Sequence, residues 1–129
     1  MILRKNISPV GWYVASYIER FEFPDEDTSN EDRRCRAWKN TIIVKAGDPE
    51  EAYQKAIEQA TLAQDSEWTR EDGLKGGRLV FEGLTSLVAI HDELEDGAEI
   101  LWRDYANSKV KTIKKMVRSK DDLEAFSRE

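Results

Sequence analysis

The strongest local signal in the chain is the beginning of a helix at Asp48-Pro49-Glu50-Glu51. Aspartate is a favoured N-cap residue, proline suits the first helical position, and acidic side chains stabilise the positive end of the helix dipole. Glu51 lies three residues after Asp48, which is the spacing of a capping box. Alanines at positions 52, 56, 60 and 63 then recur at helical spacing. We therefore expect one helix here, packed closely on a sheet by its small side chains.

Strand patterns occur in pairs on either side of this helix. Trp12 to Phe21 is rich in aromatic and β-branched residues, and residues 36–46 alternate bulky and polar side chains. After the helix, residues 78–90 and 98–105 read as two further strands, joined by a turn at Asp96-Gly97. Paired strands around a helix predict an α+β fold with a mainly antiparallel sheet in β-β-α-β-β order.

The length of the chain, 129 residues, favours a single domain. We expect its core at about residues 12–105 and a helical extension at about residues 107–127. The apolar stripe of that extension consists of Val110, Ile113, Met116 and Val117. The chain has no apolar run of the roughly 20 residues that span a bilayer and no signal-peptide pattern. We therefore expect a cytoplasmic protein with no membrane partner.

The charge of the chain is distributed unevenly. Residues 1–105 contain 13 basic and 22 acidic residues, a net charge of −9, whereas residues 106–120 contain six basic and no acidic residues, a net charge of +6. The basic side chains opposite the apolar stripe are Lys111, Lys114, Lys115 and Arg118. A basic amphipathic helix can bind an acidic partner. The commoner alternative is that such a helix packs on the acidic body of its own chain and neutralises it.

The densest acidic cluster surrounds the predicted hairpin turn. Its five carboxylates are Asp92, Glu93, Glu95, Asp96 and Glu99. Carboxylate oxygens suit a hard divalent cation. The cluster departs from the EF-hand loop, because Leu94 occupies the third ligand position and no Glu stands at the twelfth. An acidic turn is more often simply solvated, so we predict no metal site and no cofactor. A metal-dependent enzyme that uses the cluster remains an alternative function.

Three other features are candidates for a reactive or phosphate-binding site. Cys35 lies between two arginines that could activate its thiol, but no catalytic partner is near in sequence. No nucleophile is evident for the lone His91. The glycine-rich run at residues 73–77 lacks the spacing of a phosphate loop and precedes a strand. We therefore predict no catalytic residue. A single cysteine also fits a reducing compartment.

The function that these patterns favour is a non-catalytic protein-interaction module, immunity-like or regulatory, that binds another protein or a second copy of itself. Charge complementarity between an acidic body and its partner motivates this hypothesis. The acidic body disfavours nucleic acid. Weak nucleic-acid binding through the basic helix is a further alternative. Single strands also need exposed aromatic rings for stacking, and we expect the aromatic residues in the core.

Several segments also show similarity to a known family. They are Trp12-Tyr13-Val14-Ala15, Asn40-Thr41-Ile42-Ile43-Val44-Lys45-Ala46, Asp48-Pro49-Glu50-Glu51-Ala52-Tyr53, Phe81-Glu82-Gly83-Leu84 and Leu94-Glu95-Asp96-Gly97-Ala98-Glu99-Ile100. Over about residues 12–105, the chain resembles the bacterial domain of unknown function 4288. The resemblance implies one small bacterial domain. It supplies no catalytic or binding residues to carry over.

Overall fold

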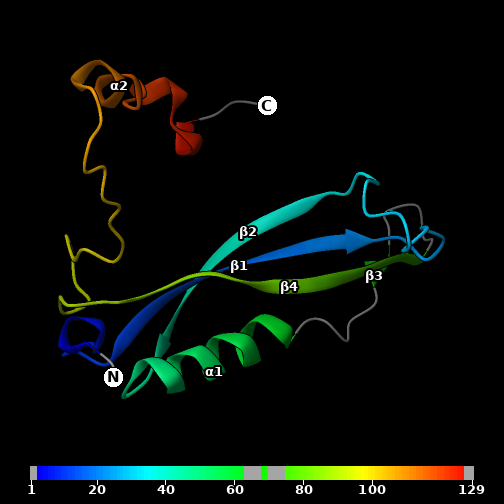
Figure 1. The fold of residues 1–129 in the computed structure, drawn as a ribbon, viewed down its shortest axis with the longest axis horizontal. Helices are drawn as coiled ribbons and strands as arrows, with labels where there is room; N and C mark the ends of the chain where they lie inside the picture. The colour runs from blue at the N-terminus through cyan, green and yellow to red at the C-terminus, as the bar shows by residue number, and fades with distance from the viewer. Residues whose placement is uncertain (1–2, 63–67, 70–74, 127–129) are drawn as a thin grey trace.

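The computed structural model describes residues 3–62, 68–69 and 75–126 (Figure 1). In chain order, its strands and helices are β1 (Trp12–Glu22), β2 (Ala37–Lys45), α1 (Pro49–Thr61), β3 (Trp68–Thr69), β4 (Lys75–Ala89) and α2 (Val110–Lys115). Three short 3-10 turns, η1 (Arg4–Asn6), η2 (Lys120–Asp122) and η3 (Glu124–Phe126), accompany them. No helix in these ranges is long and apolar enough to cross a membrane.

The strands form an antiparallel sheet in the order β2-β1-β4-β3. The central strand is β1, in which Val14 lies opposite Ile43 of β2 and Val88 of β4. The short β3 pairs only with the first residues of β4. Helix α1 runs along one face of the sheet (Figure 1). The α+β class, the antiparallel sheet and the helix packed on it are therefore confirmed.

The N-terminus of α1 is capped as predicted. Oδ1 of Asp48 accepts a hydrogen bond from the backbone N–H of Glu51 at 2.8 Å. In return, Oε1 of Glu51 accepts the backbone N–H of Gly47 at 2.9 Å. The first bond satisfies an amide that the first helical turn cannot pair internally, and the second joins Glu51 to the residue before the cap. The start of α1 is thereby fixed at the end of β2.

The core lies between α1 and the sheet. Its centre consists of Tyr13, Ala15, Val44, Ala46, Ala52 and Ala56. The predicted alanine stripe is buried at Ala52, Ala56 and Ala60, and Ala63 lies outside the described residues. Because alanine presents only a methyl group, the helix backbone approaches the strands closely. The core is therefore thin, and the larger side chains in it come from the sheet.

The predicted return strand at residues 98–105 is wrong, because the structure has no strand there. After β4 the chain turns, and the backbone N–H of Ala98 donates to the carbonyl oxygen of Glu95 at 2.9 Å. A carboxylate oxygen of Asp92 then accepts the backbone N–H of Glu99 at 3.2 Å. That amide would be needed for a hairpin ladder. The predicted β-β-α-β-β order is also wrong, since its last strand does not form.

The helical extension is shorter and more broken than the sequence predicts. Only Val110–Lys115 is α-helical, and η2 and η3 follow as separate turns. Ser119 Oγ and Asp122 Oδ2 lie 2.9 Å apart in a hydrogen bond at the start of η2. We call residues 106–126 the C-terminal arm. Figure 1 shows the arm well away from the sheet and α1, at the end of a long irregular connection.

Candidate functional site

The C-terminal arm exposes the apolar side chains that were predicted to form a stripe. Every residue of the arm is exposed. Val110 and Val117 are 70% and 79% exposed, respectively. The other large apolar residues of the arm that are exposed are Ile113, Met116, Leu123 and Phe126. The arm thus presents a row of apolar groups that the sheet and α1 do not cover.

The four basic candidates also lie in the arm, and all are exposed. Arg118 has a partner within the arm, because its guanidinium is 2.5 Å from a carboxylate oxygen of Glu124. The side chains of the three lysines of α2, Lys111, Lys114 and Lys115, form no hydrogen bond or ion pair with any described residue. The alternative in which this helix packs on the acidic body is therefore not the arrangement seen here. Its charges remain available to a partner.

The acidic cluster after β4 does not converge on a point. Across the described parts of the chain, no group of three or more His, Cys, Asp or Glu side chains lies close enough to hold a metal ion. The five candidate carboxylates Asp92, Glu93, Glu95, Asp96 and Glu99 are exposed. One of them, Asp92, is engaged by the backbone of Glu99. The structure thus gives the proposed metal ligands no shared geometry.

The remaining candidates, which are Cys35, His91 and the glycine-rich run, lie in three different parts of the structure. Cys35 is a free, exposed thiol in the segment before β2. His91 is exposed just after β4. Of the glycine-rich run, residues 73–74 lie outside the described residues, and Lys75–Gly77 begin β4. The structure does not bring these residues together into one site.

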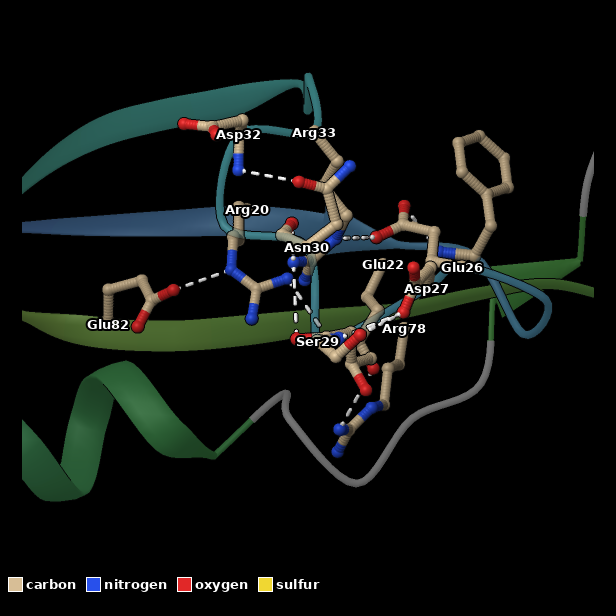
Figure 2. A network of polar contacts seen from close by, with 12 residues as sticks. Arg20, Glu22, Glu26, Asp27, Ser29, Asn30, Asp32, Arg33, Arg78 and Glu82 are labelled. Carbon is tan, nitrogen blue, oxygen red and sulfur yellow. Dashed lines mark hydrogen bonds and ion pairs between the residues drawn. The ribbon is translucent and has the colours of Figure 1, made fainter.

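A cluster of ion pairs at the far end of the sheet was not anticipated from the sequence (Figure 2). Arg20 of β1 binds Glu82 of β4 through Nε at 2.5 Å and Glu22 through a terminal nitrogen at 3.0 Å. Glu22 also accepts a bond from Arg78, its cross-strand neighbour, at 3.2 Å. The sequence indicated only that Arg20 and Glu22, two positions apart, share one face of β1. Their partners on β4 depend on the strand register, which one sequence does not reveal.

Hydrogen bonds lower the pKa of two carboxylates at this end of the sheet. The hydrogen bond from Arg20, and then that from Arg78, holds the pKa of Glu22 below its ordinary value. In the acidic loop after β1, the Phe23 amide and then Arg33 lower the pKa of Glu26. The pairs of Arg20 and Arg78 therefore join β1 to β4, and the Arg33–Glu26 pair holds the loop together. The cluster has a structural role, because its charges are paired with one another.

A cavity of about 520 Å³ lies at the opposite end of the sheet. Its lining includes Lys5 of η1, Tyr13 of β1, Leu87 of β4, His91 and Trp102. These residues come from four separate parts of the chain, so sequence spacing gave no signal for them. In Figure 1, η1, the start of α1 and the end of β4 meet at this end of the sheet.

A family model described as a domain of unknown function (DUF4288) matches residues 12–102. The chain belongs to the DUF4288 family. The region that matches DUF4288 begins with β1 and ends at Trp102, so it contains the sheet, α1 and most of the cavity wall. The C-terminal arm follows the DUF4288 region. No curated protein and no solved structure matched the chain.

Proposed function

We propose that this protein is an interaction module whose C-terminal arm binds another protein with an acidic surface. The observation that carries the proposal is the exposure of every residue of the arm, apolar ones included. Scattered single apolar residues on a surface are ordinary, but contiguous exposed apolar groups typically mark binding surfaces. Here Val110, Ile113 and Val117 follow one another at helical spacing.

The shortness of α2 supports the same proposal. An isolated helix of fewer than about 12 residues is marginal in water, because nucleation is unfavourable and few hydrogen bonds follow it. Amphipathic segments of this kind become ordered on a partner that covers their apolar side. A groove on the partner that receives Val110 and Ile113 would extend α2 toward the length that the sequence predicts.

Charge defines the partner further. Residues 106–120 carry a net charge of +6, and the lysines of α2 are unpaired within the described chain. Acidic residues around an apolar groove would speed association and favour the correct partner. The acidic body, with a net charge of −9 over residues 1–105, would repel an acidic partner elsewhere on its surface. Binding is therefore directed to the arm.

Site-specific photo-crosslinking in the full chain tests this function. A benzoylphenylalanine at Val117 should give a discrete product in lysate of the source cells, and one at Gln54 on the exposed side of α1 should not. The product should be lost in the double variant Val110→Ser, Ile113→Ser, and its yield should fall when Lys111, Lys114 and Lys115 become Glu. The purified partner should bind less tightly as salt increases. Identical products from both positions, or none, would overturn the proposal.

Nucleic-acid binding is the second candidate, and one observation favours it. The aromatic residues were expected in the core, but Trp102, Tyr105 and Phe126 are 64%, 45% and 49% exposed, and Nζ of Lys120 lies 5.2 Å from the centre of the Phe126 ring. Exposed rings and cations together can bind single strands. The aliphatic row of the arm has no role in such binding, which ranks this function second. Fluorescence anisotropy with a labelled thymidine 20-mer, at low and moderate salt, tests it. Binding that survives moderate salt and requires Trp102 would support it.

A further inference from the structure

We propose that the cavity at the η1 end of the sheet binds a small organic anion, specifically a carboxylate with a flat or aliphatic apolar body. This site is separate from the arm and does not depend on the arm's proposed function. The volume of about 520 Å³ falls within the roughly 300–1,000 Å³ typical of small-molecule sites. It is large enough for a ring or short chain bearing a single acidic group.

The floor of the cavity is apolar and held rigid. Tyr13 is only 1% exposed, and its hydroxyl oxygen accepts the backbone N–H of Ser8 at 3.0 Å. The hydroxyl of Ser8 donates in turn to the carbonyl oxygen of Ile90 at 2.5 Å. These polar groups are therefore engaged with one another. Leu87, which also lines the cavity, adds an aliphatic surface. The floor thus suits the hydrocarbon part of a ligand.

The rim of the cavity supplies positive and donor groups without acidic partners. Lys5 and His91 both line it, and neither side chain forms a hydrogen bond or ion pair with any described residue. The amide of Asn6 lies on the same wall. In a chain with 26 acidic residues, the lining of this cavity contains no aspartate or glutamate. A carboxylate placed between Lys5 and His91 would gain charge-assisted hydrogen bonds.

Trp102 lines the cavity with an indole ring that is largely exposed. It is 64% exposed, and it lines both this cavity and a smaller hollow beside Ser16 and Ser86. An indole in this position can stack on a flat ligand and lose much of its exposure when it does so. The apolar floor, the basic rim and the indole wall together define the ligand class: an aromatic or aliphatic monocarboxylate.

Matched small molecules test the site in the full chain. The probes are benzoate, 3-phenylpropionate and octanoate, each paired with its neutral amide, observed by ¹H–¹⁵N NMR titration up to 10 mM. We expect at least one carboxylate to shift the Trp102 indole and the Ala89 and His91 amide signals. Its amide should bind at least tenfold more weakly. The spectra also report whether each variant is folded.

Variants at the rim complete the test: Lys5→Gln removes a positive charge, and His91→Gln replaces the imidazole. Lys5→Gln and His91→Gln should each weaken carboxylate binding several-fold, and Trp102→Ala should weaken aromatic probes more than octanoate. The matched control is Arg34→Gln, which removes one positive charge at the other end of the sheet and should leave affinity unchanged. The proposal is overturned if no probe binds, if amides bind as well as acids, or if Arg34→Gln matches Lys5→Gln.

Discussion

The hydroxyl of Ser8 donates a hydrogen bond to the carbonyl oxygen of Ile90, 82 positions later in the sequence. Ser8 is 7% exposed and Ile90 is 1% exposed, so this bond is shielded from water. The same oxygen of Ser8 also accepts the backbone N–H groups of Val10 and Trp12. One side chain therefore joins the segment before β1 to the end of β4.

We expect Ser8→Ala to destabilise the fold by about 1–3 kcal/mol, because it leaves a buried carbonyl and two amides without their partner. Urea denaturation followed by circular dichroism measures the change. Ser108→Ala, at an exposed position without a side-chain hydrogen bond among the described residues, is the control and should lie within about 0.5 kcal/mol of the parent. Equal effects at the two positions would contradict the structural role given to Ser8.

The N-cap of α1 gives a second prediction. Asp48→Ala should cost about 0.5–2 kcal/mol, because the amide of Glu51 loses its acceptor. Asp48→Asn should retain most of the stability, since the amide oxygen of asparagine also accepts this bond. Thermal unfolding of the three proteins compares them. If the alanine and asparagine variants unfold at the same temperature, the cap contributes less than its geometry indicates.

Gly77 lies in β4 beside β3, and we expect this position not to tolerate a side chain. Its φ is +109°, and a Cβ there would overlap the carbonyl oxygen of Glu22 and lie 3.1 Å from Cα of Phe23. Gly77→Ala should therefore destabilise the protein by about 1–3 kcal/mol or more. Gly47→Ala is the matched control, because open space surrounds its Cβ position. Chemical denaturation of both variants should separate them clearly.

The ion pairs of Glu22 predict that the stability of the fold depends on pH. Because its pKa is lower in the folded chain than in the unfolded chain, its stabilising effect is present above the ordinary value of about 4.3 and is lost as pH falls through the lowered pKa. We expect the stability difference between the parent and Glu22→Gln to be largest near neutral pH and to shrink in acid. Urea denaturation from pH 3 to 7 measures it. Glu58→Gln, exposed on α1, should follow the parent at every pH.

The parts of the fold that were predicted correctly are those encoded locally. Residues 48–61 contain a cap, a proline and an alanine stripe, and α1 forms as expected. β1 and β2 also begin and end close to the predicted residues. In each case the pattern lies within the element itself. Tertiary contacts were needed only to align these elements with one another.

The failures arose where contacts between distant segments decide the outcome. Residues 98–105 carry strand-like side chains, but the Asp92 carboxylate takes the amide of Glu99 instead of a ladder partner. The helix after Ser108 was predicted from its stripe, yet the sheet and α1 do not cover that stripe, and only Val110–Lys115 remain α-helical. The basic residues of the C-terminal arm were predicted from the sequence. The cavity was not predicted, because five separate segments line it, including Pro49 at the start of α1.

The irregular connection from Glu99 to Tyr105 joins the sheet to the arm and acts as a tether. At roughly 3.3–3.6 Å per extended residue, a connection of this length can hold the arm about 2 nm from the sheet while the arm remains attached. A protein captured by the arm would then experience the body at a high effective concentration, in the millimolar range for short flexible linkers. That protein could then form a second contact with the body, even one that is too weak to form between separate molecules. Shortening the tether would weaken that second contact while leaving the arm's own affinity intact.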